Sequence, residues 1–404
     1  MKILLISPED TKGSRWGGVS TYTTLMTDYL GRLGQDVYML TPGDTNESLR
    51  QQSRTILRVR NFRERKKISV LKVMSRTLRV FFPQFEGRLH WAIDVLSFVN
   101  NNGPFDIIEA PEWGNSTLFV SLFSKQKTVV KLHRSLYCYK KDNDLPMSID
   151  VWLVCVLEFL SIIFASAITS PTRYMLSYYR HLLAMRKIIR RKHIDVIPYG
   201  IEIETKRMRK PRHTERQRYI LFVGRIEKAK GSYILIRAFK RVVKQFKNVR
   251  LLLIGEDTPI IVDQKPQSYK RYLRSYIHRN HLGKKIRIFD KKARRELKQY
   301  YSDSLFVVVP SVKNENLPFV VLEAMSHSKT VIASNTGGLP EIIQDRINGL
   351  LFRPNDSKDL AEKIMHVLRN DREKLTYEQQ NANRIREFDI QRIALQTLSF
   401  YKEV

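Results

Sequence analysis

Short apolar runs that alternate with amphipathic stretches constrain the fold of this chain more than any other feature. In the first half these runs are KILLIS, DVYMLTP, FDIIEA and TVVKLH, with a helix expected from about residue 20 to residue 33. The second half repeats the pattern with YILFVG, VRLLLIG, KIRIFD, LFVVVPS and TVIAS. Strands that alternate with helices predict doubly wound parallel sheets. Such sheets bind ligands beyond the carboxyl ends of their strands, so we expect functional residues in the loops there.

The chain length and one polar segment predict two domains. A chain of 404 residues exceeds the usual size of a single hydrophobic core. Pro198 and Gly200 mark a turn in IDVIPYGIE, and the polar stretch KRMRKPRHTERQR that follows breaks any apolar period. We therefore expect domains at residues 1–205 and 206–385, followed by an amphipathic C-terminal helix over residues 386–404.

Two glutamates lie on either side of a predicted helix start. Glu315 and Glu323 are separated by seven residues in SVKNENLPFVVLEAMSHSKTVIASNTGGLPE. Pro318 fits the first turn of this helix, where its missing N–H has no cost. The start of a helix offers backbone N–H groups and a positive dipole end, which suit a phosphate or a sugar hydroxyl. Two glutamates at this spacing, taken alone, are more often solvated surface charges.

A second segment places two cations in a loop between a strand and a helix. The stretch YILFVGRIEKAKGSYILIRAF is typical of a buried strand, a glycine turn and a helix that begins near Gly231. Arg225 and Lys230 project from that loop. Arg suits planar bidentate contact with a diphosphate and Lys supplies a compact point charge. The alternative is a pair of solvated loop cations in a generally basic chain.

These segments resemble the family 4, or group 1, retaining glycosyltransferases, through the E-x7-E pair, the GR-x4-K-G loop and the stretches VIASNTGGLPEII and NGLLF. The resemblance covers nearly the whole chain. It implies the GT-B architecture, in which two Rossmann-like domains face an interdomain cleft and the C-terminal helix packs back on the first domain. It further implies that Arg225 and Lys230 hold the donor diphosphate. In that family the glutamate at the position of Glu315 contacts the donor sugar, and the one at Glu323 bonds the ribose.

Other loops resemble substrate-contacting parts of the same family. His133 ends the strand TVVKLH, where the family places an active-site histidine that contacts the donor sugar; a core histidine is the alternative. Paired glycines after the first strand, in SRWGGVSTYTT, resemble the family's glycine-rich loop. The substrate-binding candidates besides Glu323 are Gly17, Gly18, Asn316, Leu317, Phe319 and Val320.

Two departures from the family pattern bear on substrate choice. Many relatives have a glycine-rich stretch directly after the first glutamate, where this chain has Asn316, Leu317 and Pro318. After the strand KIRIF the family usually has a glycine, where Asp290 and Lys291 stand here. The first departure affects backbone contact with the sugar, and the second affects the loop that faces the nucleotide base.

The reaction implied by the resemblance is transfer of a hexose from a nucleotide diphosphate sugar to an acceptor hydroxyl, with retention of configuration. We expect a role in cell-surface polysaccharide or glycolipid synthesis. No Asp-x-Asp type ligand cluster stands out, so we expect neither a metal nor a cofactor besides the donor. One alternative is an epimerase-like GT-B enzyme that acts on sugar nucleotides. The other is a non-catalytic basic protein that binds nucleic acid or membrane, although no nucleic-acid fold signature occurs.

The charge balance favours acidic partners. Lys and Arg number 71 against 40 Asp and Glu, which gives a formal net charge of +31. Basic and apolar residues mix in Arg63–Phe82 and Arg173–Lys192, at spacings that a helix sorts into two faces. These stretches predict an acceptor that is lipid-linked or presented at an anionic membrane surface. A solvated helix face is the alternative.

Other parts of the sequence favour a cytoplasmic protein at the inner face of the cell membrane. Cys138 and Cys155 are the two cysteines, and they form neither a disulfide framework nor a zinc motif. The opening MKILLISP has too short an apolar core for a signal peptide. Glu158 interrupts the apolar stretch Val151–Ile168, which we therefore expect to be a packed core helix rather than a membrane span.

Overall fold

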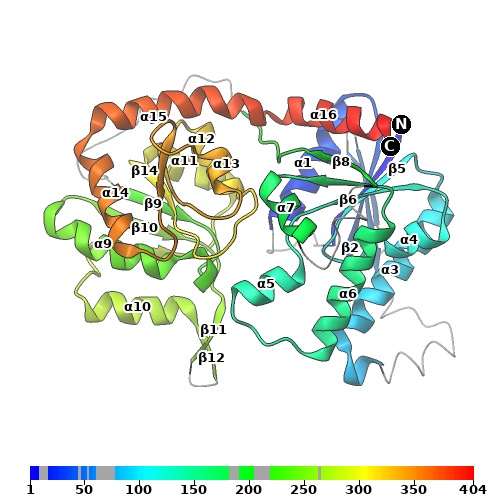
Figure 1. Ribbon diagram of the computed structural model, residues 1–404, viewed down its shortest axis with the longest axis horizontal. Coiled ribbons are helices and arrows are strands. Elements are labelled where there is room, and N and C mark those ends of the chain that lie inside the picture. Colours follow the sequence, from blue (N-terminus) through cyan, green and yellow to red (C-terminus); the bar gives the residue numbers. More distant parts are fainter. Residues whose placement is uncertain are drawn as a thin grey trace. The chain divides into compact units, whose positions relative to one another are not determined.

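A computed structural model describes residues 1–8, 17–43, 47–51, 54–60, 78–181, 191–203, 219–262 and 265–404. The chain forms two compact α/β units, Met1–Gly200 with Ile390–Val404, and Ile201–Asp389 (Figure 1). The predicted boundary at residue 205 lies outside the described residues, as do residues 63–77 and 182–190 of the two basic stretches.

The first unit is built on an eight-stranded sheet with the order β3-β4-β2-β1-β5-β6-β7-β8. All neighbouring strands are parallel except β3 and β4. Its elements are, in chain order, β1 (Lys2–Ile6), α1 (Gly18–Arg32), β2 (Asp36–Gly43), β3 (Glu47–Gln51), β4 (Arg54–Arg60), α3 (Pro83–Asn102), β5 (Ile107–Pro111), α4 (Leu118–Phe123), β6 (Lys127–Lys131), α5 (Leu136–Asp142), α6 (Ile149–Phe164), β7 (Ala167–Ser170), α7 (Arg173–His181), β8 (His193–Val196) and α16 (Ile390–Glu403).

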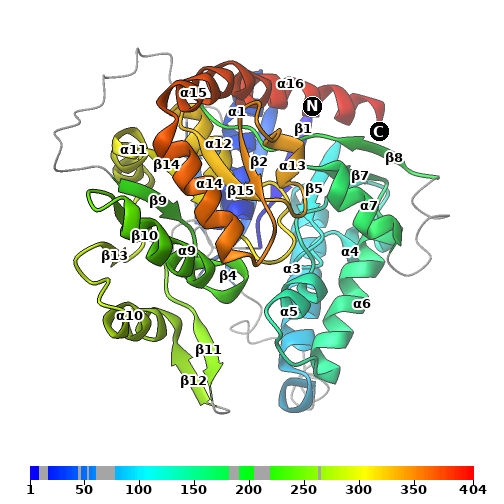
Figure 2. The same cartoon turned by 60° about the vertical axis from the view of Figure 1, so that its left-hand side comes forward.

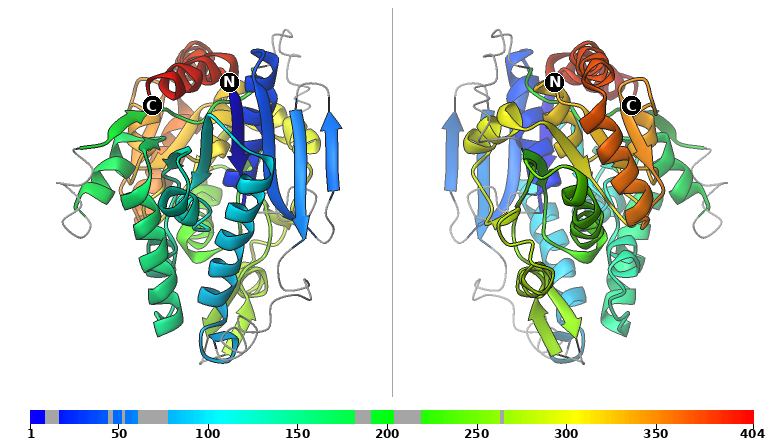
Figure 3. Two further views of the ribbon diagram at one scale, coloured as in Figure 1. Left: turned by 90° about the vertical axis from the view of Figure 1, so that its right-hand side faces the viewer. Right: turned by 90° about the vertical axis from the view of Figure 1, so that its left-hand side faces the viewer.

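Strand order in this sheet reverses between β1 and β5, because the chain moves outward from β1 to β2 and returns to start β5 on the other side. The helices α3, α4 and α6 pack against one another, as the cyan and green helices of Figure 3 show. Helix α16 packs against α1, which confirms the predicted C-terminal helix on the first domain. It begins at Ile390, because a 3-10 turn, η4 (Ile385–Phe388), precedes it.

The second unit has an all-parallel six-stranded sheet with the order β13-β10-β9-β14-β15-β16. Strand order reverses between β9 and β14. An antiparallel hairpin, β11 with β12, lies beside α10 (Figure 2). The elements are β9 (Tyr219–Val223), η3 (Lys228–Lys230), α9 (Ser232–Gln245), β10 (Arg250–Ile254), β11 (Pro259–Val262), β12 (Lys265–Ser268), α10 (Tyr269–Arg279), β13 (Ile286–Phe289), α11 (Arg294–Asp303), β14 (Phe306–Val309), α12 (Phe319–Ser326), β15 (Val331–Ser334), α13 (Leu339–Ile342), β16 (Gly349–Phe352), α14 (Ser357–Arg369), α15 (Asp371–Arg384) and η4.

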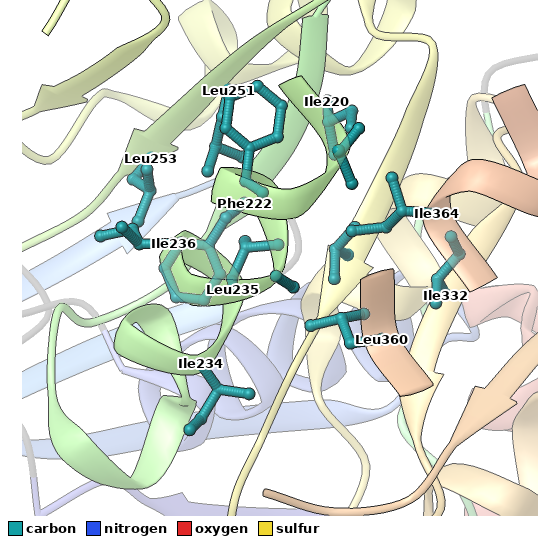
Figure 4. Close-up of a cluster of buried hydrophobic side chains, with 14 of the residues drawn as sticks. Ile220, Phe222, Ile234, Leu235, Ile236, Leu251, Leu253, Ile332, Leu360 and Ile364 are labelled. Carbon is teal, nitrogen blue, oxygen red and sulfur yellow. The ribbon is translucent and has the colours of Figure 1, made fainter. Parts of the chain in front are cut away.

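The core of the second unit forms where α9 and α14 cover β9 and β10 (Figure 4). Apolar residues recur in α9 at helical spacing, so one face of this helix is buried. Leu235 packs in the same cluster as Phe222 of β9 and Ile364 of α14. This core fixes both ends of the loop that joins β9 to α9, and that loop carries two of the predicted site residues.

The apolar stretch Val151–Ile168 spans two elements, a helix and the strand that follows it. It comprises most of α6 and the first residues of β7. Among the described residues, no helix is both long and apolar enough to cross a membrane. The prediction of a packed core helix is wrong for one face of α6, because Trp152 is 49% exposed and Val156 is equally exposed.

Glu158 lies on the opposite, buried face of α6. Its carboxylate accepts a hydrogen bond of 2.8 Å from the backbone N–H of Leu136 at the start of α5. Burial is the main cause that raises the pKa of Glu158 to about 8. This glutamate therefore ties α6 to α5 inside the unit.

Candidate active site

The loop between β9 and α9 carries Arg225 and Lys230. It leaves β9 at the carboxyl edge of the sheet, forms η3 and enters α9 after Gly231. Gly231 has a φ angle of 71°, and a Cβ there would lie 1.7 Å from the carbonyl oxygen of Pro310, which follows β14. Only glycine fits a backbone that is both left-handed and this close to another chain segment. The loop is therefore held against the end of β14.

Lys230 meets Glu315 where the strand order reverses. The Nζ atom of Lys230 lies 2.5 Å from Oε1 of Glu315, and the Ser311 hydroxyl donates a hydrogen bond of 2.7 Å to the same oxygen. Glu315 is 7% exposed, and the side chain of Lys230 is 22% exposed. Residues from two motifs, 85 positions apart in the chain, thus form one charged cluster beyond the carboxyl ends of β9 and β14.

The loop after β15 holds the backbone of Glu315 in place. The N–H of Gly338 donates a hydrogen bond of 2.8 Å to the carbonyl oxygen of Glu315. Gly337 has a φ angle of 61°, and a Cβ there would lie 2.0 Å from that same oxygen. Sequence reasoning missed this role of Gly337, for which the paired glycines of NTGGLPE were the available signal.

Arg225 is held by a different carboxylate from Lys230. One guanidinium nitrogen lies 3.1 Å from Oε1 of Glu227 in the same loop. Glu227 is buried, whereas the Arg225 side chain is 44% exposed. Each of the two loop cations therefore has a carboxylate partner, and a phosphate would compete with those partners.

Glu323 lies on α12 and contacts two residues of α11. The Tyr301 hydroxyl donates a hydrogen bond of 2.7 Å to its Oε2 atom, and Nε of Arg294 lies 3.6 Å from Oε1. Burial raises the pKa of Glu323, while the hydrogen bond from Tyr301 and the charge of Arg294 oppose that rise. Sequence reasoning missed both partners. The role of Glu323 as a ribose ligand stays a prediction.

The start of α12 differs slightly from the prediction. Pro318 caps the helix rather than occupying its first turn, and the helix begins at Phe319. Four residues here were substrate-binding candidates, and their contact with substrate stays a prediction. Asn316 and Leu317 are buried, and Phe319 and Val320 are half-buried.

Asp290, which stands where relatives usually have glycine, forms an ion pair. Its Oδ1 atom lies 2.5 Å from Nζ of Lys270, a buried residue of α10. The hydrogen bond from Lys270 holds the pKa of the Asp290 carboxyl below its usual value. The loop after β13 is thus fastened to α10, through a partner that sequence reasoning missed.

His133 lies in the first unit, two residues beyond β6, and is buried. Its backbone N–H donates a hydrogen bond of 2.7 Å to Glu112, and its Nδ1 atom lies 2.5 Å from the Tyr199 hydroxyl oxygen. The imidazole stacks on the Tyr199 ring with centroids 5.3 Å apart. Burial and the charge of Lys131 lower the pKa of His133 to about 3. The imidazole is therefore neutral at ordinary pH.

Two buried charged residues, Lys131 and Glu109, contact Tyr22, whose ring lies against the imidazole of His133. The Nζ atom of Lys131 donates a hydrogen bond of 3.0 Å to the carbonyl oxygen of Ile197 and lies 4.7 Å from the centroid of the Tyr22 ring. The Tyr22 hydroxyl donates a hydrogen bond of 2.8 Å to Glu109. Burial lowers the pKa of Lys131 to about 8 and raises the pKa of Glu109, and each charge opposes the shift of the other. Sequence reasoning missed this pair, because both residues occur inside apolar strands.

Glu112 lies at the reversal of strand order in the first unit, directly after β5. It accepts a hydrogen bond of 2.9 Å from the Tyr179 hydroxyl and the one from His133 already described. Burial raises the pKa of Glu112 to about 7. This carboxyl positions the loop of His133, a role that sequence reasoning also missed.

The paired glycines mark the start of α1. The helix begins at Gly18, two residues earlier than expected, and Gly17 is its N-cap. The backbone N–H of Gly17 donates a hydrogen bond of 3.0 Å to the Ser20 hydroxyl. Residues 9–16 of the preceding loop lie outside the described residues, so substrate contact by these glycines stays a prediction.

In the described part of the chain, no group of three or more His, Cys, Asp or Glu side chains has the arrangement to hold a metal ion. The predicted contact of Lys230 and Arg225 with a diphosphate, and the expectation that no metal is needed, stay predictions.

Comparison with protein families identifies the class that this fold and these loops define. The description "Glycosyltransferase Family 4" matches residues 16–205, and "Glycosyl transferases group 1" matches residues 204–385. The chain belongs to the family 4, or group 1, glycosyltransferases.

Curated relatives agree with this assignment over part of their length. An uncharacterized glycosyltransferase of Methanocaldococcus jannaschii is 32% identical over 46% of this chain and 48% of its own. The lipopolysaccharide 1,2-N-acetylglucosaminetransferase of Salmonella typhimurium is 26% identical over 49% and 52%, respectively. The D-inositol 3-phosphate glycosyltransferase of Corynebacterium efficiens is 28% identical over 52% and 51%. The chain thus spans about half the length of the curated relatives it matches.

Solved structures share the GT-B fold along the whole chain. The sucrose-phosphate synthase of Thermosynechococcus elongatus aligns with a TM-score of 0.78 and 20% identity, over 100% of this chain and 98% of its own. Anabaena HepE in complex with UDP aligns with a TM-score of 0.69 and 18% identity over 100% of both chains. These similarities establish the fold of the two units.

Proposed function

We propose that this protein is a retaining glycosyltransferase that moves a hexose from a nucleotide diphosphate sugar to an acceptor hydroxyl. The observation that carries the proposal is the contact between Lys230 and Glu315 at the reversal of strand order in the second unit. Doubly wound sheets bind ligands at this point. A cation suited to phosphate therefore lies against a carboxylate suited to sugar hydroxyls.

The proposed reaction exchanges one bond of the sugar for another. The bond from the anomeric carbon to the diphosphate oxygen breaks, a bond to the acceptor oxygen forms, and the acceptor hydroxyl loses its proton. Negative charge develops on the leaving diphosphate, where Lys230 and Arg225 stabilise it. Their existing partners are carboxylates, so they are already oriented toward negative oxygen atoms.

Three other residues position the donor in this proposal. Glu315 accepts hydrogen bonds from sugar hydroxyls, and Glu323 accepts them from the ribose. A carboxylate has about four lone-pair sites, so the bond from Tyr301 leaves Glu323 with capacity for further donors. His133 contacts the sugar as a neutral imidazole, because its pKa of about 3 leaves it without charge at ordinary pH.

The names of similar proteins guide the choice of donor and acceptor. HepE has been solved with UDP-glucose, so UDP-sugars are the first donors to test. Similarity to a lipopolysaccharide glycosyltransferase supports an acceptor in cell-surface polysaccharide or glycolipid synthesis. We propose that this acceptor is lipid-linked and that the protein acts at the inner face of the cell membrane.

Product analysis tests the transferase proposal. A thermal-shift screen with UDP, GDP, ADP and their sugar conjugates selects the donor, and NMR of the product reports the anomeric configuration. The expected product retains the configuration of the donor. An inverted product would contradict retention, and an epimerised sugar nucleotide without transfer would support the epimerase alternative instead.

Chelation tests the proposal that the loop cations make a metal unnecessary. Transfer should continue in EDTA at an unchanged rate. Loss of transfer in EDTA with recovery on adding magnesium or manganese would contradict it.

A further inference from the structure

Exposed apolar side chains concentrate on one helical layer of the first unit. Of the eleven large apolar residues that are exposed in the described structure, two directly precede α3, two lie on α4 and four lie on α6. These eight are Val80, Phe81, Leu122, Phe123, Ile149, Trp152, Val156 and Phe164. An exposed apolar patch of this kind marks a surface that contacts a partner or a membrane.

Four of these residues lie at the same end of the α3–α6 pair, and Val156 lies one turn beyond Trp152 on the same side of α6. The carboxylate of Asp150, in the first turn of α6, accepts hydrogen bonds of 3.1 Å and 2.8 Å from the backbone N–H groups of Gln84 and Phe85 at the start of α3. The N-terminal ends of both helices therefore lie together, as Figure 1 shows. We call this surface the helix-end patch; it consists of Val80, Phe81, Ile149, Trp152 and Val156.

The charges around the helix-end patch are mainly positive. Every acidic residue within α3, α5 and α6 is buried, namely Glu86, Asp94, Asp142, Asp150 and Glu158. Lys141 of α5 is exposed, and the Arg79 side chain, which also pairs with Glu86, is 51% exposed. Asp144, in the loop between α5 and α6, is the exposed acid nearby. The surface thus combines apolar side chains with a basic rim.

Trp152 joins the apolar and basic parts of this surface. Its ring lies 5.9 Å from the ring of Tyr137, and Nζ of Lys141 lies 5.8 Å from the centroid of that tyrosine. Trp and Tyr are favoured where one side of a ring is apolar and the other is wet, and Lys extends its charge from such a boundary. This combination is typical of side chains at the interface of a bilayer.

We propose that the helix-end patch inserts into the headgroup region of an anionic membrane and brings the enzyme to a lipid-linked acceptor. The proposal rests on the lipid-linked acceptor of the proposed function. Self-association through the same patch fits less well. A twofold contact would place the basic rim of one copy against that of the other, whereas anionic lipid headgroups complement it.

Vesicle co-sedimentation of the full chain tests the proposal. The protein is mixed with phosphatidylcholine vesicles, or with vesicles that also contain phosphatidylglycerol, in the absence of donor and acceptor. We expect binding to the anionic vesicles only. The variant Ile149→Gln/Trp152→Gln/Val156→Gln should reduce the partition coefficient at least about tenfold, since three apolar side chains lose their burial in lipid.

A matched variant controls for a general loss of apolar surface. Ile347→Gln/Leu375→Gln/Leu395→Gln changes three residues that are 54%, 53% and 54% exposed elsewhere, and it should bind as the wild type does. All substituted side chains are exposed, so both variants should fold, and circular dichroism checks this. The charge variant Lys140→Glu/Lys141→Glu should also weaken binding to anionic vesicles.

Each other outcome overturns the proposal. Wild-type protein that stays in the supernatant with anionic vesicles contradicts it, as does a helix-end variant that binds like the wild type. A wild type that sediments as a dimer in the ultracentrifuge, while the helix-end variant is monomeric and neither binds vesicles, would identify a self-association surface instead. Donor turnover with a water-soluble acceptor is measured separately, so failure of vesicle binding is distinguishable from failure of the transferase proposal.

Discussion

Replacing Lys230 by Ala tests the proposed donor site most directly. The Nζ atom of Lys230 lies 2.5 Å from the buried carboxylate of Glu315. In the nucleotide complex the same ammonium is expected to contact the diphosphate. Losing a charge-assisted hydrogen bond costs about 1.5–3 kcal/mol, and about 1.4 kcal/mol corresponds to a tenfold change in affinity. Lys230→Ala should therefore weaken binding of the preferred nucleoside diphosphate about tenfold to a hundredfold.

Glu315→Gln gives a second result of opposite sign. Glutamine keeps the shape of the side chain but removes the negative charge that competes with phosphate for Lys230. Nucleoside diphosphate should bind Glu315→Gln at least as tightly as the wild type, whereas sugar transfer should fall because the proposed sugar contact is altered. A mere loss of local packing would weaken both properties together.

Isothermal titration calorimetry measures these affinities, with Lys228→Ala as the control. Lys228 lies in the same short helix two positions away and is exposed, so its removal changes the net charge of the loop equally. Affinity of Lys230→Ala within about twofold of the wild type would refute the assignment. So would an equal loss in Lys228→Ala, because the effect would then belong to the general charge of the loop.

Three further predictions concern the surroundings of the site. Gly337→Ala should lower the free energy of unfolding, measured by urea titration, by about 2 kcal/mol or more and should reduce transfer, because its Cβ would lie 2.0 Å from a backbone oxygen and the backbone there is left-handed. Gly283→Ala is the control: a Cβ at Gly283 has no atom within 4 Å, so this variant should change neither property. Glu323→Gln should weaken binding of a ribonucleoside diphosphate more than that of its 2′,3′-dideoxy analogue, and equal losses would contradict ribose contact. The pKa of His133 is about 3 in the folded protein against 6.5 for an ordinary histidine, so the folded protein binds fewer protons than the unfolded chain between these pH values. The stability that neutral His133 contributes is therefore lost as the pH falls from about 6.5 to about 3. The pH-dependent loss in the free energy of unfolding should be smaller in His133→Gln.

The sequence predicted the two parallel sheets because their strands are recognisable from short apolar runs. KILLIS and YILFVG, for example, correspond to β1 and β9. It also placed Arg225, Lys230 and Glu315 in loops after strands, since glycine and proline mark those loops. The family resemblance assigned Lys230 to the diphosphate and Glu315 to the sugar, but neither the resemblance nor a local pattern predicted that these two side chains contact each other.

The partners of the site residues could not be predicted from local patterns. Tyr301 contacts Glu323 across 22 positions, and Tyr199 contacts His133 across 66 positions. Each is an aromatic residue in a segment where burial in the core is the ordinary expectation. A tyrosine hydroxyl that forms a hydrogen bond with a carboxylate or imidazole far away in the sequence can be identified only when the fold is known.

Exposure of one face of helix α6 also could not be predicted from the local sequence. Its apolar composition with one internal Glu158 predicted a packed core helix, and Glu158 is indeed buried. α6 is apolar on more than one face, so the 3.6-residue period of its apolar residues does not show which face packs against the protein and which is exposed. Trp152 became a candidate for membrane contact only when its exposure and its position beside Tyr137 and Lys141 were known. Net charge alone pointed to acidic partners in general, whereas the burial of every acid in α3, α5 and α6 identifies one surface where such a partner would be met.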